Sequence, residues 1–179
     1  CQLDSHFVQL LETKIENSRF ARVDSDTVDN LIPKDDRSKP ELTEAEQENL
    51  SVMFKAVLPK ENEYHVQAEN LGAEAAPILI TQSEFMRRYR EMSAMGGGMN
   101  FYGEMPAMYN IVVNMEHPLV SKIVAAAAEH KDAIEAFALD NEILKQITDL
   151  ALLANGMLKG KDLSDFIARS AKVVEDAYL

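Results

Sequence analysis

Residues 140–178, DNEILKQITDLALLANGMLKGKDLSDFIARSAKVVEDAY, determine the fold that this sequence predicts. Apolar residues recur at intervals of three and four in both halves of the stretch, which is the spacing of one face of an α-helix. We expect Asp140 to cap a first helix that runs to Asn155 and is closed by Gly156. We expect Asp162 to cap a second helix that runs close to the end of the sequence. A short connection would make the two helices a hairpin.

Each of these helices is apolar over more of its circumference than one neighbouring helix can cover. A small sheet in the same chain could cover the second face, or a second copy of the chain could cover it in a four-helix bundle with a two-fold axis. We favour the second alternative, which makes the chain a homodimer. The residues expected in the dimer interface are those of the apolar stripes: Ile143, Ile147, Leu150, Ala151, Ala154, Phe166, Ile167, Ser170, Val173 and Val174.

Three strands are expected before the hairpin. Alternating apolar and polar residues predict strands within 63–71 and 108–115, and the run of apolar residues at 78–80 predicts a strand within 76–81. Because Gly72 allows a turn, we expect the first two strands to pair antiparallel. The predicted fold class is therefore α+β, a three-stranded, mainly antiparallel sheet with helices that ends in a hairpin forming a four-helix-bundle dimer.

Two further helices are predicted around these strands. Thr43 and Glu46 have the spacing of a capping box, so a helix is expected to begin there and to stop at Pro59. Pro118 fits the first turn of a helix that continues to about His130.

The sequence also predicts a domain boundary. Residues 34–41 carry charged residues and a proline but no other apolar residue, which is typical of a linker. Residues 42–179 would form one domain. Residues 1–33 would belong to a preceding domain, with an amphipathic helix at 3–16, a short strand at 19–23 and at most two helical turns at 27–32.

Methionine is concentrated in one segment. Six of the nine methionines fall between Ser83 and Tyr109, where a helix is expected from Ser83 to about Ala94, before Gly96-Gly97-Gly98. Such a helix could belong to the core, because methionine fills irregular gaps. It could equally be an adaptable surface for unrelated apolar partners, because the methionine side chain is unbranched and polarizable.

Composition excludes several functions. The 179 residues carry 18 Lys and Arg against 30 Asp and Glu, a net charge of −12, which argues against binding to nucleic-acid phosphates. One cysteine excludes an internal disulfide and a multi-cysteine zinc site, and no apolar run is long enough to span a membrane. No pattern of His, Asp, Glu, Ser or Gly identifies a catalytic, cofactor-binding or metal-binding residue.

Several segments together resemble a known family. The strongest are Asn114 to Val120 (NMEHPLV) and residues 149–154 (DLALLA), supported by residues 162–166 (DLSDF) and the stretch from Met86 to Met95. In this order they resemble the C-terminal domain of the ninety-kilodalton heat-shock protein chaperones of the bacterial HtpG type. Residues 4–24 resemble the end of the middle domain of that family.

The resemblance implies a homodimer held by the last two helices and a cytoplasmic stress-response protein that binds unfolded proteins. It implies that an ATP site, with Mg²⁺, belongs to a part of the parent protein outside this chain, so this chain should not itself hydrolyse ATP. Contact with non-native clients is expected from the amphipathic helix before the third strand: Phe85, Met86, Tyr89, Met92 and Met95. The sequence ends without the acidic motif that binds tetratricopeptide co-chaperones, so such partners, nucleic acid and membranes are not expected.

Two alternatives remain open at the level of the sequence. Cys1 could be the lipidated first residue of a mature lipoprotein, which would make the chain a membrane-anchored binding module. The many carboxylates could also include the site of a small hydrolase that has no recognisable motif.

Overall fold

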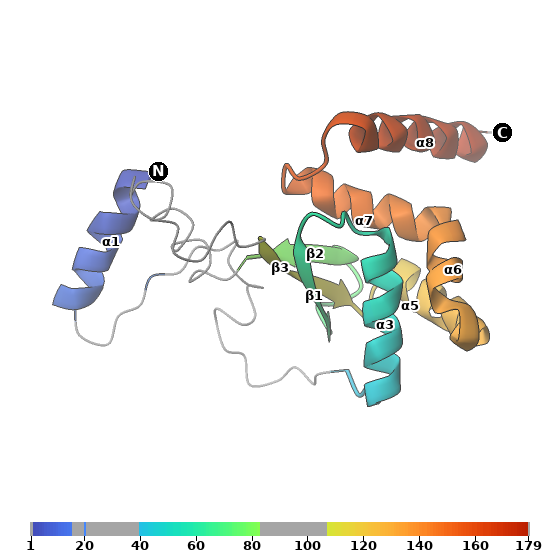
Figure 1. Cartoon of the computed structure of the whole chain (residues 1–179), viewed down its shortest axis with the longest axis horizontal. Coiled ribbons are helices and arrows are strands. Elements are labelled where there is room, and N and C mark those ends of the chain that lie inside the picture. Colours follow the sequence, from blue (N-terminus) through green and yellow to red (C-terminus); the bar gives the residue numbers. More distant parts are fainter. Residues whose placement is uncertain (1, 16–19, 21–39, 83–106, 179) are drawn as a thin grey trace.

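The computed structural model describes residues 2–15, 20, 40–82 and 107–178 (Figure 1). Its centre is a three-stranded sheet of β1 (Glu63–Glu69), β2 (Ile78–Thr81) and β3 (Met108–Asn114). The strand order is β1-β3-β2, with β1 parallel and β2 antiparallel to β3. The α+β class is confirmed. The predicted antiparallel pair of the first two strands is wrong, and the sheet is mixed rather than mainly antiparallel.

Asn114, at the end of β3, explains why β1 and β2 do not form a hairpin. Its side chain is fully buried; its Oδ1 accepts from the backbone N–H groups of Leu71 (3.1 Å) and Glu116 (3.2 Å). Its Nδ2 donates to the carbonyls of Gly72 (2.8 Å) and Ala76 (3.3 Å). The connection between β1 and β2 is thereby tied to the end of β3, which lies between them.

Gly72 is the residue of this connection that needs glycine. Its φ of 92° lies in the left-handed region, where a side chain would be strained. Its N–H donates to Oε2 of Glu116 over 2.6 Å. The turn that the sequence indicated at Gly72 is present, but it leads the chain around β3 rather than back along β1.

Helix α3 (Glu44–Val57) begins as predicted. The hydroxyl of Thr43 accepts from the N–H of Glu46 (3.3 Å), and Oε2 of Glu46 accepts from the N–H of Thr43 (2.9 Å), which completes the capping box. The helix ends before Pro59, as expected, and buries Leu50, Met53 and Phe54 in the core.

The segment after β3 contains one helix more than predicted. His117 caps α5 (Pro118–Ala127), its Nδ1 accepting from the N–H of Leu119 (3.2 Å). The predicted continuation to His130 is instead the 3₁₀ helix η1 (Ala128–Ala133), in which His130 has non-helical dihedral angles. Helix α6 (Ile134–Asp140) follows and was not predicted.

The last two helices are α7 (Glu142–Ala154) and α8 (Gly160–Tyr178). Both start points differ from the prediction. Asn141, not Asp140, caps α7, because its Oδ1 accepts from the N–H of Leu144 over 2.8 Å. Helix α8 starts at Gly160, so Asp162 lies in its first turn and does not cap it.

The core lies between one face of the sheet and the helices packed on it. Alternate residues of the strands point to this face, and the most buried of them, Ile111 and Val113 of β3, are fully covered. Helix α3 packs on β1 and on α6, while α7 packs on β2 (Figure 1). No helix in the described part of the chain is long and apolar enough to cross a membrane.

The N-terminal helix α1 (Gln2–Lys14) confirms the predicted amphipathic helix, and Phe7 and Leu10 on it are exposed. The strand expected at 19–23, apart from Phe20, the turns at 27–32 and the helix at 83–94 lie outside the described residues. The proposed division into residues 1–33, a linker at 34–41 and a domain at 42–179 remains a prediction.

Candidate functional site

The α7–α8 hairpin is the candidate site, because its two helices are covered very differently. Helix α7 packs into the core through Leu144, Ile147, Thr148, Ala151 and Leu152. Helix α8 lies along α7 at the edge of the molecule (Figure 1). Among its described side chains only Phe166 is buried, and every residue from 171 to 177 is exposed.

Two glycines allow the turn between the helices. Gly156 and Gly160 have φ angles of 65° and 58°, both in the left-handed region. The N–H groups of Gly156 and Met157 donate to the carbonyls of Leu153 and Leu152, each over 2.9 Å, and so satisfy the end of α7. Gly156 therefore closes α7 as predicted.

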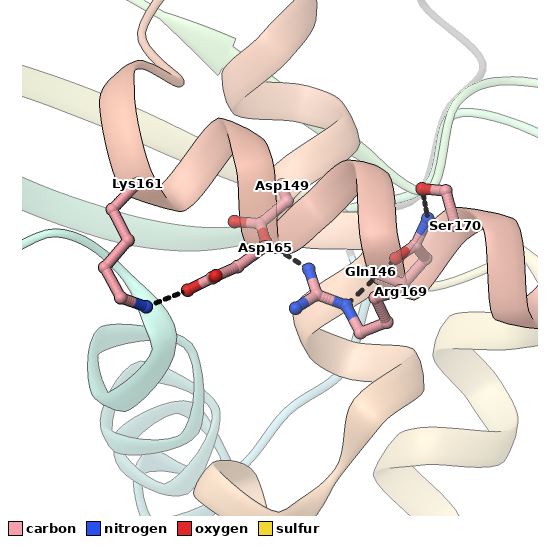
Figure 2. Close-up of polar contacts among 6 residues, drawn as sticks. All are labelled: Gln146, Asp149, Lys161, Asp165, Arg169 and Ser170. Carbon is pink, nitrogen blue, oxygen red and sulfur yellow. Dashed lines mark hydrogen bonds and ion pairs between the residues drawn. The ribbon is translucent and has the colours of Figure 1, made fainter.

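A chain of polar contacts joins α7 to α8 (Figure 2). The guanidinium of Arg169 forms an ion pair with Asp149, and its Nε donates to Oε1 of Gln146 over 3.0 Å. Nε2 of Gln146 in turn donates to the hydroxyl of Ser170 over 2.7 Å. A second ion pair, Lys161 with Asp165, lies within α8 and is exposed.

Within the contacts between α7 and α8, folding changes the pKa of the Asp149 carboxyl. Burial raises its pKa above the ordinary value, and this effect exceeds the opposing effect of Arg169, which stabilises the ionised form. Asp162 adds a smaller increase and Lys145 a smaller decrease. The contact between the two helices therefore carries a carboxylate that folding partly removes from water.

The raised pKa predicts how the stability of the hairpin depends on pH. The folded chain retains the Asp149 proton at higher pH than the unfolded chain does, so this group contributes most stability below its ordinary pKa and loses that contribution as pH rises through the raised value. The difference in free energy of unfolding between wild type and Asp149→Asn should thus shift in favour of wild type from pH 7 to pH 4. Urea denaturation at several pH values measures it, and a shift the other way would show that the ion pair outweighs burial.

Six large apolar side chains of the hairpin are left uncovered by the described part of the chain. Each is 40–60% exposed, and we call them the hairpin apolar surface: Ile143, Leu150 and Leu153 on α7, and Ile167, Val173 and Val174 on α8. Isolated exposed apolar residues are common, but a cluster on two adjacent helices is typical of an interaction site.

The residues predicted for the dimer interface divide into three groups. Ile147, Ala151 and Phe166 are buried within the chain, and Ser170 is half-buried in its contact with Gln146. The others are exposed: Ile143, Leu150, Ala154, Ile167, Val173 and Val174. The prediction omitted Leu153, although the sequence places it beside the apolar stripe of α7. The residues predicted to contact clients, Phe85, Met86, Tyr89, Met92 and Met95, lie outside the described residues.

The described residues contain no group of three His, Cys, Asp or Glu side chains that could hold a metal ion.

Known proteins with similar sequences indicate the family of this chain. No family model matches the sequence. Curated relatives do: the chain is 36% identical to the chaperone protein HtpG of Porphyromonas gingivalis and 38% identical to that of Bacteroides fragilis, in each case over 97% of this chain and 34% of the relative. Over this stretch, the chain matches a fragment of HtpG.

HtpG of Bacteroides thetaiotaomicron is similar to the same extent, with 36% identity over 97% of the chain. The chain spans about a third of the length of these HtpG proteins. The matched stretch runs over 231 residues, more than the 179 of this chain, so the HtpG relatives carry residues within it that this chain lacks. The resemblance that the sequence suggested is confirmed.

Proposed function

We propose that this chain is the C-terminal homodimerisation and client-contact domain of an ATP-dependent, HtpG-like molecular chaperone. The hairpin apolar surface carries the proposal, because the described chain leaves it uncovered at the end of a segment similar to HtpG. In this proposal a second copy covers it through a four-helix bundle of two α7–α8 hairpins.

The geometry of α8 supports a second copy as the partner. The helix has 19 residues and is about 28 Å long, but its C-terminal half contacts little of its own chain. A two-fold axis would place each α8 on the partner's hairpin, so the same exposed apolar side chains would be buried in both protomers. Fully burying one Val, Leu or Ile contributes about 1.5–3 kcal/mol. These side chains are already about half covered, so each would contribute roughly half of that, and the six of each protomer would together offset the entropy lost on association.

Dimerisation would give the chaperone its mechanism. Two protomers joined at this domain hold their ATP-binding arms at a high effective concentration, so closure of the arms becomes intramolecular. ATP and Mg²⁺ belong to other parts of the parent protein. We expect no ATPase activity, cofactor or metal in this chain itself. We also propose a cytoplasmic location, without nucleic-acid, membrane or tetratricopeptide partners.

Client contact is assigned to the Met-bearing segment, at Phe85, Met86, Tyr89, Met92 and Met95. Its support is chemical, since methionine side chains adapt to apolar partners of different shapes. Non-native proteins expose such apolar surface without a fixed shape.

The mass in solution tests the dimer. At tens of micromolar the purified chain should have about twice its protomer mass of 20.0 kDa in sedimentation equilibrium. Its melting temperature should rise with concentration, because association stabilises the folded state by mass action. A 20.0 kDa species with a concentration-independent melting temperature would contradict the proposal.

A further inference from the structure

Strand β1 is at the edge of the sheet, and the hydrogen bonds show which of its residues face outward. The N–H of Glu63 donates to the carbonyl of Ala107, and the carbonyl of Glu69 accepts from Met115, both over 2.9 Å. Residues 63, 65, 67 and 69 therefore bond toward β3. By alternation, the backbone groups of Tyr64, Val66 and Ala68 point away from the sheet.

One side chain occupies part of this edge. Nε2 of Gln47, on α3, donates to the carbonyl of Val66 over 3.0 Å. Within the described part of the chain, the remaining outward N–H and C=O groups of Tyr64, Val66 and Ala68 have no hydrogen-bond partner. Unpaired groups on a sheet edge are a template for another strand.

Two open hollows follow one another along this edge, beside α3. One, of about 560 Å³, lies between the N-terminal half of α3 and the residues Val66 and Ala68. The other, of about 390 Å³, lies between the C-terminal end of α3 and Tyr64. The two hollows thus lie beside the two ends of β1, and we call them, together with the strand edge between them, the groove.

The two ends of the groove carry opposite charge. Glu44 and Glu48 line the hollow at the Ala68 end. Lys55 and Lys60, with Glu63 as the opposing charge, line the hollow at the Tyr64 end. The two glutamates, Glu44 and Glu48, and the two lysines are all exposed, so they are accessible to a ligand.

We propose that this groove binds an extended segment of a non-native polypeptide as an added strand antiparallel to β1. The charges set the chemistry of the segment: basic residues at its N-terminal end, beside Glu44 and Glu48, and acidic residues at its C-terminal end, beside Lys55 and Lys60. Backbone hydrogen bonds would supply most of the affinity and accept many sequences, which suits a partner without a fixed fold. The groove is formed by other residues than those of the Met-bearing segment and of the hairpin apolar surface.

Binding of a labelled peptide tests the groove. The peptide has lysines at its N-terminal end, alternating Thr and Val in the middle, and glutamates at its C-terminal end. Fluorescence anisotropy with the full chain measures its dissociation constant. N-methylation of the residues that face β1 should weaken binding at least about 10-fold, whereas N-methylation of the intervening residues should not, because only the former donate to the edge. A peptide with the charged ends exchanged should also bind at least about 10-fold more weakly.

Hydrogen exchange locates the binding. The peptide should slow exchange of the amides of Val66 and Ala68 and leave those of His65 and Gln67 as they are, because the latter already bond to β3. Protection of Val66 and Ala68 in the free chain would show that the edge is already paired and would overturn the proposal.

Variants complete the test. Ala68→Pro removes an outward N–H, which an edge strand tolerates, and should abolish measurable binding. Gln47→Ala removes the competitor for the Val66 carbonyl and should tighten binding by about 5-fold. Glu44→Lys with Glu48→Lys should weaken it, whereas Glu129→Lys with Glu135→Lys, the same charge change on exposed positions elsewhere, should not.

Equal binding of both N-methylated peptides, or of the charge-exchanged peptide, would overturn the proposal without requiring any variant to fold. The proposed dimer is tested by mass, so the two proposals fail independently.

Discussion

Asn114→Ala is expected to lower the free energy of unfolding by roughly 3–5 kcal/mol. The alanine removes four side-chain hydrogen bonds from a fully buried position and leaves the N–H groups of Leu71 and Glu116 and the carbonyls of Gly72 and Ala76 without this partner. Each buried group left unpaired costs about 1–3 kcal/mol, and local relaxation recovers part of the sum. The loss is a large fraction of the stability of a single domain.

Chemical denaturation monitored by circular dichroism measures this effect. Asn110→Ala is the matched control, since Asn110 lies on the same strand and face but is half-buried, and it should cost less than about 1 kcal/mol. Asn114→Asp should also destabilise, because a carboxylate accepts but cannot donate to the carbonyls of Gly72 and Ala76. An Asn114→Ala variant as stable as the Asn110→Ala control would show that water replaces the side chain and that the connection between β1 and β2 is not held by it.

Features set by a few adjacent residues could be predicted from the sequence. The capping box of Thr43 and Glu46, the start of α5 at Pro118 and the end of α7 at Gly156 each depend on hydrogen bonds or dihedral angles within one turn. Such local signals do not decide between two adjacent residues that are equally suited to a role. Asp140 and Asn141 are both good caps, and the sequence does not show which side-chain oxygen accepts from the first turn of the helix.

The strand order could not be predicted in this way. Gly72 indicates a turn but not where the turn leads, and the parallel pairing of β1 with β3 joins residues 45 positions apart, such as Glu63 and Met108. The decisive residue, Asn114, belongs to the motif that carried the family resemblance. Its position after Val113 and before a proline-initiated helix gives no sign that it is buried.

Helical periodicity likewise identified the apolar faces of the hairpin without saying what covers them. Ile143 and Ile147 lie one turn apart on the same stripe, yet Ile147 is 4% exposed and Ile143 is 55% exposed. The difference arises along the helix: Ile147 lies in the core between α7 and the elements packed on it, whereas Ile143, in the first turn of α7, lies outside that core. A test of the proposed dimer therefore has to use exposed positions, because a charge at Ile147 would disrupt the protomer itself.

Ile167→Asp with Val174→Asp should raise the dissociation constant of the proposed dimer by at least about 100-fold. The two residues are two helical turns apart on α8 and are 58% and 60% exposed in the protomer, so their replacement removes little from the fold of one chain. In a symmetric four-helix bundle, each variant dimer would bury four unpaired carboxylates, each costing several kcal/mol. Sedimentation velocity over a dilution series measures the constant.

Lys172→Glu is the control for this variant. It changes the net charge by the same two units, is exposed, and lies on the opposite, charged side of α8, so it should leave association within a few-fold of wild type. At a dilution where wild type has dissociated, all three proteins should melt together, because none of the substituted side chains belongs to the protomer core. Equal association of wild type and the double variant would place any dimer contact elsewhere. A lower melting temperature of the diluted double variant would instead assign Ile167 and Val174 to the packing of α8 on its own chain.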